Sequence, residues 1–352
     1  MRSIFGFLFK DFTLSISIFF LITFSVVVLF SLDKPLFPLY FVYIFVAIGA
    51  FWFFSQVDFD IISLFSKHLY ITSIVLLLLT LIIGRVTRGT IRWIPIGPFS
   101  LQPAEIVRPL LLVFFATYMT KGQMDVKKAI TSVVLLAIPV ILILIQPSLG
   151  VSVLTVVGFT GVLIAGKFNK KYLLAVLAGI LVLIPLLWFF LAPYQKQRIQ
   201  TFLDPEKDPL GAGYNSLQST IAVGSGKIFG TGLGKGIQTQ LAFLPEKQTD
   251  FIFAAVAEEL GIVGATIILS ISFILLFRLI RFMENAVSPA GRAYISGFFL
   301  IYLVQIFVHV GMNMGMLPVT GVPFPLLSAG GSSLLATMAG LGIALGCMKR
   351  FE

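Results

Sequence analysis

The sequence predicts an all-α, polytopic membrane protein, and three observations lead to this prediction. Hydrophobic residues make up 58% of the 352 residues, whereas soluble domains are about 45–50% apolar. Only 11% of the residues are charged, and the mean hydropathy is +1.03. The apolar runs are about 20 residues long, which is the length of a membrane-spanning helix and about twice that of a barrel strand.

Ten apolar segments have the length and composition of membrane spans. They cover residues 12–32, 37–54, 67–84, 102–120, 128–145, 148–166, 171–191, 250–277, 291–312 and 328–348. We expect both termini to lie in the cytoplasm, because most Lys and Arg residues then fall on the inner side of the membrane. The first apolar run is too long for a signal-peptide core and has no small-residue cleavage pattern, so we expect it to be retained as a helix.

A large loop at about 192–249 separates the seventh predicted span from the eighth and lies outside the cell in this topology. We treat residues 1–352 as one integral membrane domain that includes this extracytoplasmic loop. Within it, 214–223 has the pattern of a short interfacial helix. Glycine is dense over 224–236, which suits either a close approach of backbone to a ligand or helix, or a flexible hinge. Neither of the common nucleotide-binding glycine motifs occurs there.

Charge and cysteine content exclude several classes of function. The net charge of +10 requires no nucleic-acid partner, because anionic membrane lipids attract the same Lys and Arg residues. Cys347 is the only cysteine, so the chain has no internal disulfide and no thiolate metal cluster. Three arginines, Arg85, Arg88 and Arg92, crowd one short outer loop, against the usual charge bias. Either an anionic ligand or lipid headgroups would compensate them.

A polar group marks the start of the fourth predicted span. Pro103 suits the first turn of a helix, where a missing N–H does no harm. Gln102, Glu105 and Arg108 follow one another at spacings of three, and the last two form an i,i+3 pair in the favourable order. Such a pair either joins two helices or binds a phosphate group. The nearby Trp93 has a simpler interpretation as a residue of the membrane interface.

The eighth predicted span carries three carboxylates. Asp250 lies at its mouth, and Glu258 and Glu259 lie deeper in the span. A charged side chain inside a bilayer costs about 2.5–3.5 kcal/mol on insertion scales, so it normally faces a cavity or a partner. Asp250 suits either a functional site or a helix cap. At least one of the two glutamates must meet a partner, because they point to different sides of the helix.

The last predicted span is preceded by a proline-rich outer loop at 313–327 and begins with small residues, among them Ser328 and Ser332. Small residues permit close contact between helices, or they leave room for a ligand.

Together these segments resemble the SEDS family (shape, elongation, division and sporulation), specifically its RodA branch. The resemblance covers essentially the whole chain. It rests on RWI, QPAEIVR, QPSLG, FLDPEKDPLGAGYNSLQS, AVGSG, QTQLAFLPEKQTDFIFAAVAEELG and GVPFPLLSAGGSS. The segment TQLAFLPE is more similar to RodA than to the division paralogue FtsW. The chain departs from the family pattern at Arg108, where lysine is common, at Gln248, where histidine is common, and at Ala329, where tyrosine is common.

The resemblance implies a peptidoglycan glycosyltransferase of the bacterial cytoplasmic membrane. Such an enzyme polymerises lipid II, an undecaprenyl-pyrophosphate-linked disaccharide peptide, at the outer membrane face during cell elongation, together with a class B penicillin-binding transpeptidase. The family's essential aspartate falls on Asp250 and its important tryptophan on Trp93. Its buried acidic and basic pair falls on Glu105 and Arg108.

Asp250 would then take a proton from the acceptor sugar hydroxyl as general base. Cations would stabilise the pyrophosphate leaving group, and our candidates are Arg92, Arg88, Lys247 and Arg108. Gln102, Ser328 and Ser332 complete the expected substrate-binding set. A divalent cation, Mg or Mn, is a further candidate that the sequence does not identify. Two rival functions stay open: a lipid II flippase, and a scaffold without catalytic activity that activates a transpeptidase.

Overall fold

The computed structural model describes residues 11–87, 90–97, 99–123, 125–166, 193–204 and 212–348. The chain divides into two compact units. The first contains Met1–Ile44, Pro193–Arg278 and Leu303–Gly330, and the second contains Phe45–Ala192, Leu279–Tyr302 and Gly331–Glu352. The chain passes from one unit to the other within three helices, which are α2 (Leu39–Gln56), α12 (Ile252–Glu284) and α13 (Pro289–Asn313).

The first unit is built mainly on α1 and α12. Its other described elements are short: η2, the start of α2, α9, α10, α11 and the end of α13. The bounds are α1 Phe12–Leu32, η2 Lys34–Leu36, α9 Pro193–Leu203, α10 Ala212–Ser225 and α11 Ile237–Gln240. Asp11 caps α1 by accepting a 2.8 Å hydrogen bond from the Leu14 N–H, and it also forms an ion pair with Arg278 of α12. This buried carboxylate therefore ties the start of α1 to α12.

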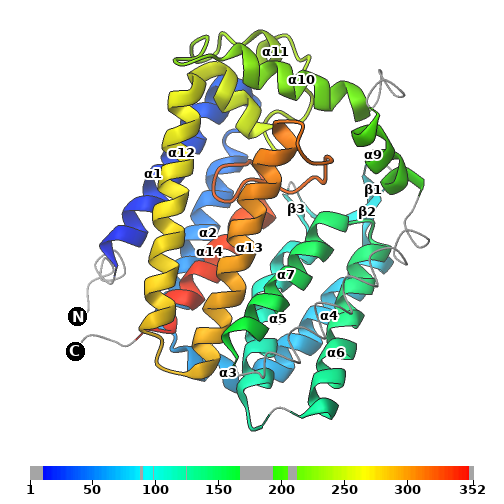
Figure 1. The fold of residues 1–352 in the computed structure, drawn as a ribbon, viewed down its shortest axis with the longest axis vertical. Helices are drawn as coiled ribbons and strands as arrows, with labels where there is room; N and C mark the ends of the chain where they lie inside the picture. The colour runs from blue at the N-terminus through cyan, green and yellow to red at the C-terminus, as the bar shows by residue number, and fades with distance from the viewer. Residues whose placement is uncertain are drawn as a thin grey trace. The chain divides into compact units, whose positions relative to one another are not determined.

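Helix α12 is broken near its N-terminal end, where the sequence predicts a continuous span. Gly261 has φ 67° and ψ −163°, a conformation that glycine adopts without a steric penalty. The backbone groups released at the break are paired with the glycine-rich segment, since Ile262 N donates to Lys227 O at 2.9 Å and Thr231 N donates to Glu258 O at 2.9 Å. In Figure 1 this end of α12 lies beside α10 and α11. Of the two sequence interpretations of 224–236, the close backbone approach is confirmed.

The second unit packs helices around α5, which contacts α4, α7 and α14. The bounds are α3 Phe59–Leu64, α4 Ser66–Ile83, α5 Pro103–Thr120, α6 Val126–Ile145, α7 Leu149–Ala165 and α14 Gly331–Gly346. Small residues let α7 and α13 approach closely, because a β-carbon on Gly161 would lie only 2.7 Å from Gly297 Cα. At this contact Ser296 Oγ donates to Gly161 O at 2.8 Å.

The loop predicted before the fourth span is a small antiparallel sheet. Strands β1 (Arg85–Thr87), β2 (Thr90–Ile96) and β3 (Phe99–Leu101) lie in that order. In the register, Arg85 is paired with Trp93 and Ile94 with Leu101. The sequence does not predict this sheet, because its strands are too short to give a clear alternation of apolar and polar residues.

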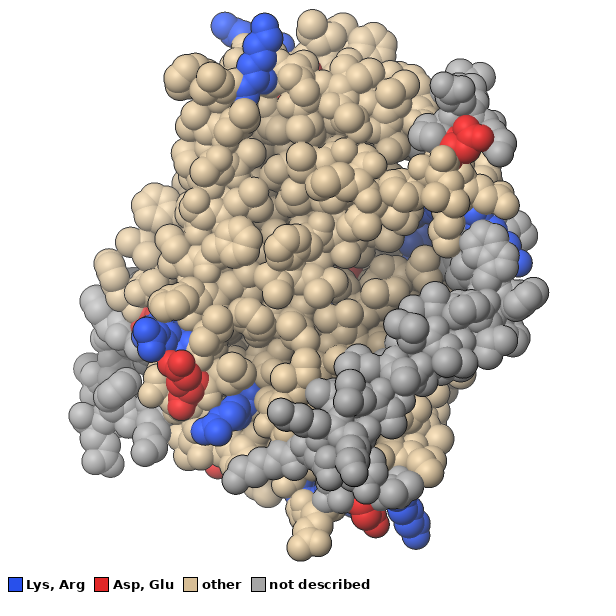
Figure 2. Space-filling model, viewed as in Figure 1, with Lys and Arg blue, Asp and Glu red and all other residues tan. Residues whose placement is uncertain are grey.

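Within the described residues, six helices are long and apolar enough to cross a membrane. They cover Phe12–Leu32, Leu39–Gln56, Ser66–Ile83, Lys127–Ile145, Ile252–Glu284 and Pro289–Asn313. Helices α7 and α14 are apolar but shorter. The predicted span at 171–191 lies outside the described residues, and each of the other predicted ranges coincides with a helix. Most of the surface visible in Figure 2 carries no charged side chain, as a membrane protein requires.

Candidate active site

Asp250 lies in a turn just before α12, and the backbone there is held at three consecutive residues. The Asn313 side chain donates from Nδ2 to the carbonyl oxygen of Asp250 at 3.0 Å. Ser328 Oγ donates to Thr249 O at 2.8 Å, and the Ala329 N–H donates to Gln248 O at 2.9 Å. The half-buried Asp250 is therefore presented from a turn whose main chain is fixed by contacts from the end of α13 and from the loop before α14.

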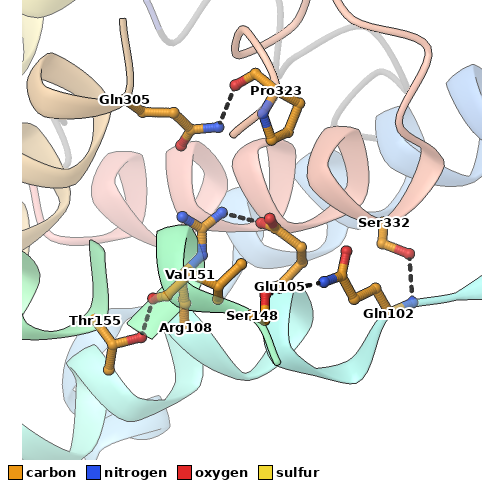
Figure 3. A network of polar contacts seen from close by, with 9 residues as sticks. All are labelled: Gln102, Glu105, Arg108, Ser148, Val151, Thr155, Gln305, Pro323 and Ser332. Carbon is orange, nitrogen blue, oxygen red and sulfur yellow. Dashed lines mark hydrogen bonds and ion pairs between the residues drawn. The ribbon is translucent and has the colours of Figure 1, made fainter. Parts of the chain in front are cut away.

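The loop that carries Ser328 is itself fastened to α13. Gln305 Nε2 donates to Pro323 O at 2.8 Å (Figure 3), and His309 Nδ1 donates to Val322 O at 2.7 Å. Ser328 Oγ also accepts the Phe324 N–H at 2.8 Å. Both hydrogen-bonding functions of the Ser328 hydroxyl are thus used in holding this loop and the turn before Asp250.

Asn313 is fully buried and acts as the polar hub of the site. Its Oδ1 accepts the Ala254 N–H at 3.0 Å, which caps the first turn of α12. Its Nδ2 also donates to His309 O at 2.8 Å, and its own carbonyl accepts a 2.8 Å bond from Ser219 Oγ of α10. Sequence reasoning missed Asn313. Its signal was present as an amide at the end of an apolar helix, where a polar group needs a specific partner.

The carboxylate of Asp250 has an arginine in its neighbourhood. A β-carbon built on Gly321 would lie 3.6 Å from Asp250 Oδ2 and 4.0 Å from Arg198 Nη1, so both atoms flank the same point. Arg198 belongs to α9, and its Nη1 is held in place by a 3.0 Å bond to Val319 O. Sequence reasoning missed Arg198 as well, because only the folded loop brings α9 to the start of α12. An arginine here can bind an anionic group next to the carboxylate.

Lys247 directs its ammonium group at α11. Its Nζ donates to the carbonyl oxygen of Thr239, so this lysine fastens α11 to the turn that leads to Asp250. The charge stays half-buried beside the site.

Glu258 and Glu259 both hold α11, so both meet partners, as the sequence predicts for at least one of them. Glu258 accepts backbone N–H groups from Gln238 at 2.8 Å and from Thr239 at 3.0 Å. Glu259 accepts from Gln240 Nε2 at 2.9 Å and from Ser31 Oγ at 2.6 Å. These charge-assisted bonds compensate the burial of the carboxylates and fix the loop above α12.

The second unit contains the remaining described candidates, and four of them, Gln102, Glu105, Arg108 and Ser332, lie at or beside the start of α5 (Figure 3). Gln102 donates two hydrogen bonds to serine hydroxyls. Its backbone N–H donates to Ser332 Oγ at 2.8 Å, and its Nε2 donates to Ser148 Oγ at 3.4 Å. Glu105 and Arg108 form the predicted i,i+3 ion pair, with side chains only 3% and 4% exposed.

Only one nitrogen of the Arg108 guanidinium is used in that pair. In the part of the chain that the structure describes, Nε and Nη1 of Arg108 have no hydrogen-bond partner. Leaving buried donors unpaired is costly, at about 1–3 kcal/mol each. These two unpaired donors favour a role in which Arg108 donates hydrogen bonds to an anionic oxygen or to ordered water.

Arg92 and Trp93 lie in β2, and both are half-buried. Because side chains alternate along a strand, these neighbours point to opposite faces. Arg92 takes part in further interactions and is not a free cation. Arg88 lies outside the described residues.

The predicted residues thus fall into two sets, one in each unit. Asp250, Lys247 and Ser328 belong to the first unit, and the described members of the second are Arg92, Trp93, Gln102, Glu105, Arg108 and Ser332. Among the described residues, no group of three or more His, Cys, Asp or Glu side chains could hold a metal ion.

Comparison with known proteins identifies the family. The cell cycle protein family model FtsW/RodA/SpoVE matches residues 5–350. Peptidoglycan glycosyltransferase MrdB of Escherichia coli K12 is 41% identical over 283 residues, which are 80% of this chain and 76% of that protein. A probable peptidoglycan glycosyltransferase FtsW of Aeromonas salmonicida is 37% identical over 307 residues, covering 84% of this chain and 77% of that protein.

Solved structures agree with this assignment. A chain of a peptidoglycan synthase complex, solved in a study of how polymerization and crosslinking are coordinated, is similar with a TM-score of 0.80 and 29% identity, covering 95% of this chain and 96% of that chain. Rod shape determining protein RodA of Thermus thermophilus is similar with a TM-score of 0.70 and 27% identity, covering 96% and 95%. The chain belongs to the FtsW/RodA/SpoVE family.

Proposed function

We propose that this chain is a peptidoglycan glycosyltransferase that polymerises lipid II during cell elongation, with Asp250 as the general base. Relatives that carry the name peptidoglycan glycosyltransferase match at 41% identity over most of the chain, and a chain of a peptidoglycan synthase complex matches in fold over 95% of it.

The observation that carries the role of Asp250 is the triple tether of its turn. The Ala254 N–H at the start of α12 is taken by Asn313 Oδ1, and Oδ2 of Asp250 and Nη1 of Arg198 flank the point where Gly321 has no side chain. A fixed main chain that presents a carboxylate beside an arginine suits a group that must meet a substrate hydroxyl at a set position.

The reaction follows from the chemistry of the two substrates. The acceptor hydroxyl oxygen attacks the anomeric carbon of the donor sugar, and its proton passes to the Asp250 carboxylate. The bond from the anomeric carbon to the phosphate oxygen breaks, and the lipid pyrophosphate leaves with the electron pair. One displacement of this kind inverts the anomeric centre. Arg198 stands where it can stabilise charge on the departing phosphate.

The set in the second unit has groups of its own that suit a substrate anion and sugar. Arg108 has buried donors to offer to an anionic oxygen, while Gln102 and Ser332 hold the start of α5 beside it. Trp93, with Arg92 and Arg88 near it in sequence, supplies an aromatic surface and positive charge for sugar and phosphate groups.

The same proposal extends to the membrane arrangement and the partners. We propose ten spans, a large extracytoplasmic loop between the seventh and eighth, and cytoplasmic termini. A class B penicillin-binding transpeptidase is the proposed partner, supported by the fold match to a chain of a synthase complex. A divalent cation, Mg or Mn, stays a proposal; it would arrive with the pyrophosphate, and no step above depends on it.

The test is polymerisation of fluorescent lipid II by the purified chain together with its transpeptidase partner. We expect glycan polymer from the native chain and none from Asp250→Asn at equal folding. Glu284→Gln serves as a matched control, because it removes an exposed carboxylate whose ion pair with Arg281 is also exposed. Undiminished polymer from Asp250→Asn would reject Asp250 as the base and favour the scaffold. Lipid scrambling without polymer from either protein would favour the flippase.

A further inference from the structure

The break in α12 marks one boundary of the membrane hydrocarbon. From Ile262 to Phe277 the helix has no charged residue, and Arg278, Arg281 and Glu284 follow. At 1.5 Å per residue, the distance from Gly261 to Arg281 is about 30 Å, which is the thickness of the hydrocarbon core. With Arg281 at one headgroup layer, Gly261 therefore stands at the edge of the opposite leaflet.

The glycine-rich segment meets α12 at that same level. Ile262 N donates to Lys227 O at 2.9 Å, and Val263 N donates to Ile228 O at 3.1 Å. A β-carbon on Gly261 would lie only 2.4 Å from Ile228 O. The backbone of 227–230 is thus in direct contact with the first residues of the apolar stretch of α12.

The side chains on this segment are apolar and exposed. Phe229 is 80% exposed and Ile228 is 58% exposed, and the adjacent Ile262 of α12 is 62% exposed. Full burial of a large apolar side chain stabilises it by about 1.5–3 kcal/mol, so leaving both loop residues in water forfeits much of that energy. Because Ile262 begins the exposed apolar face of a helix that can span the membrane, the surface of Ile228 and Phe229 continues that face.

The backbone conformation of the loop holds Ile228 and Phe229 in their exposed positions. Lys227 has φ 48° and Gly230 has φ 78°, so left-handed residues bracket the Ile228–Phe229 pair. A β-carbon on Gly230 would lie 2.2 Å from Glu259 O, which shows how tightly the segment is pressed onto α12. Lys227, which is exposed, places positive charge directly before the apolar pair.

We propose that 227–230 is a lipid anchor, in which Ile228 and Phe229 enter the bilayer leaflet on the Gly261 side while Lys227 contacts phosphate headgroups. The occupant is the phospholipid of the membrane itself. Aromatic residues gather at this depth in membrane proteins, and lysine is attracted to anionic headgroups. The anchor holds the outer loop against the membrane surface, at the end of the segment that Glu258 and Glu259 fasten.

The test uses nitroxide spin labels at single cysteines in the full-length chain, reconstituted in nanodiscs of phosphatidylethanolamine and phosphatidylglycerol. Cys347→Ser removes the one native thiol while keeping a donor for its bond to Ile343 O. Labels are placed by Phe229→Cys, by Lys235→Cys as the aqueous reference and by Ile274→Cys as the hydrocarbon reference, since Ile274 is 47% exposed in mid-helix. If the Cys347→Ser background folds poorly, the native thiol can stay, because it is buried.

Collisions with oxygen, which concentrates in hydrocarbon, are compared with collisions with a water-soluble nickel chelate. We expect oxygen to dominate at positions 229 and 274 and nickel to dominate at 235, a reversal of the ratio within one loop. Dominance of nickel at 229 would place Phe229 in water and overturn the proposal. Low collision rates with both reagents at 229 would mean that protein covers it, as in a second copy of the chain, and would overturn the proposal equally.

Discussion

Replacing Asn313 by alanine tests whether the turn that presents Asp250 must be held in place. The change removes the acceptor of the Ala254 N–H and the donor to the Asp250 carbonyl. Ala254 is fully buried, and a buried group left without a partner costs about 1–3 kcal/mol. The Asp250 carbonyl is partly buried and costs less, so we expect a loss of about 2–4 kcal/mol.

Two readouts separate stability from positioning. The midpoint temperature of thermal unfolding in detergent should fall by about 4–8 °C, because a loss of 1 kcal/mol lowers it by about 2 °C in a chain of this size. At a temperature where the variant is folded, kcat for lipid II polymerisation should fall by about 10–100-fold with little change in KM, because a misplaced base loses the reacting geometry. Asn285→Ala is the matched control, since Asn285 is exposed and bonds only to Arg281 O among the hydrogen bonds described for its side chain.

The double variant decides between a direct and an indirect effect. If Asn313 acts through Asp250, adding Asn313→Ala to Asp250→Glu, a variant that keeps a displaced carboxylate and a measurable residual rate, should cause no further loss of activity. A native polymerisation rate in folded Asn313→Ala would refute the reasoning, because the tether would then be unnecessary. A further loss in the double variant would show that Asn313 contributes by another route.

Three other changes test the ion pair on α5, the break in α12 and the arginine near Asp250. Glu105→Ala should lower the unfolding temperature more than the charge-swapped Glu105→Arg/Arg108→Glu variant, because it leaves a buried charge unpaired at a cost of about 3–5 kcal/mol; equal losses would show that position rather than pairing matters. Gly261→Ala should destabilise the chain measurably in the same unfolding assay, because its β-carbon would lie 2.4 Å from backbone atoms, whereas Gly49→Ala, with no atom within 4 Å, should not. Arg198→Gln should lower kcat for lipid II polymerisation with unfolding unchanged, and Arg198→Lys should restore part of it; full activity in Arg198→Gln would remove this residue from the site.

Local patterns predicted the helices and the pair on α5. Long apolar runs locate the spans to within a few residues, and Pro103 begins α5 as its lack of an N–H suggests. The spacing of Glu105 and Arg108 was sufficient to predict their contact, because it depends only on helix geometry. The membrane character of the chain needed no more than composition.

Contacts between distant segments could not be read from the sequence. Asn313 contacts Asp250, which is 63 residues away in the sequence. No local pattern in either segment indicates that the two residues meet. The break at Gly261 was missed for the same reason, because a glycine within an apolar run is compatible with a continuous helix until the loop at 227–232 is seen to pair with its backbone. The roles of Glu258 and Glu259 were underdetermined, since the partners of their carboxylates lie on α1 and on α11.

The hydrogen bonds of the Glu258 carboxylate determine which substitutions α11 and the residue before it tolerate. The carboxylate binds the main-chain N–H groups of Gln238 and Thr239 rather than their side chains, so exchange of those side chains leaves the grip intact. Gly236 has no such freedom, because a β-carbon there would come within 2.5 Å of Glu258 Oε2. Engineered variants of this loop can therefore be diversified at Gln238, while Gly236 must be left alone.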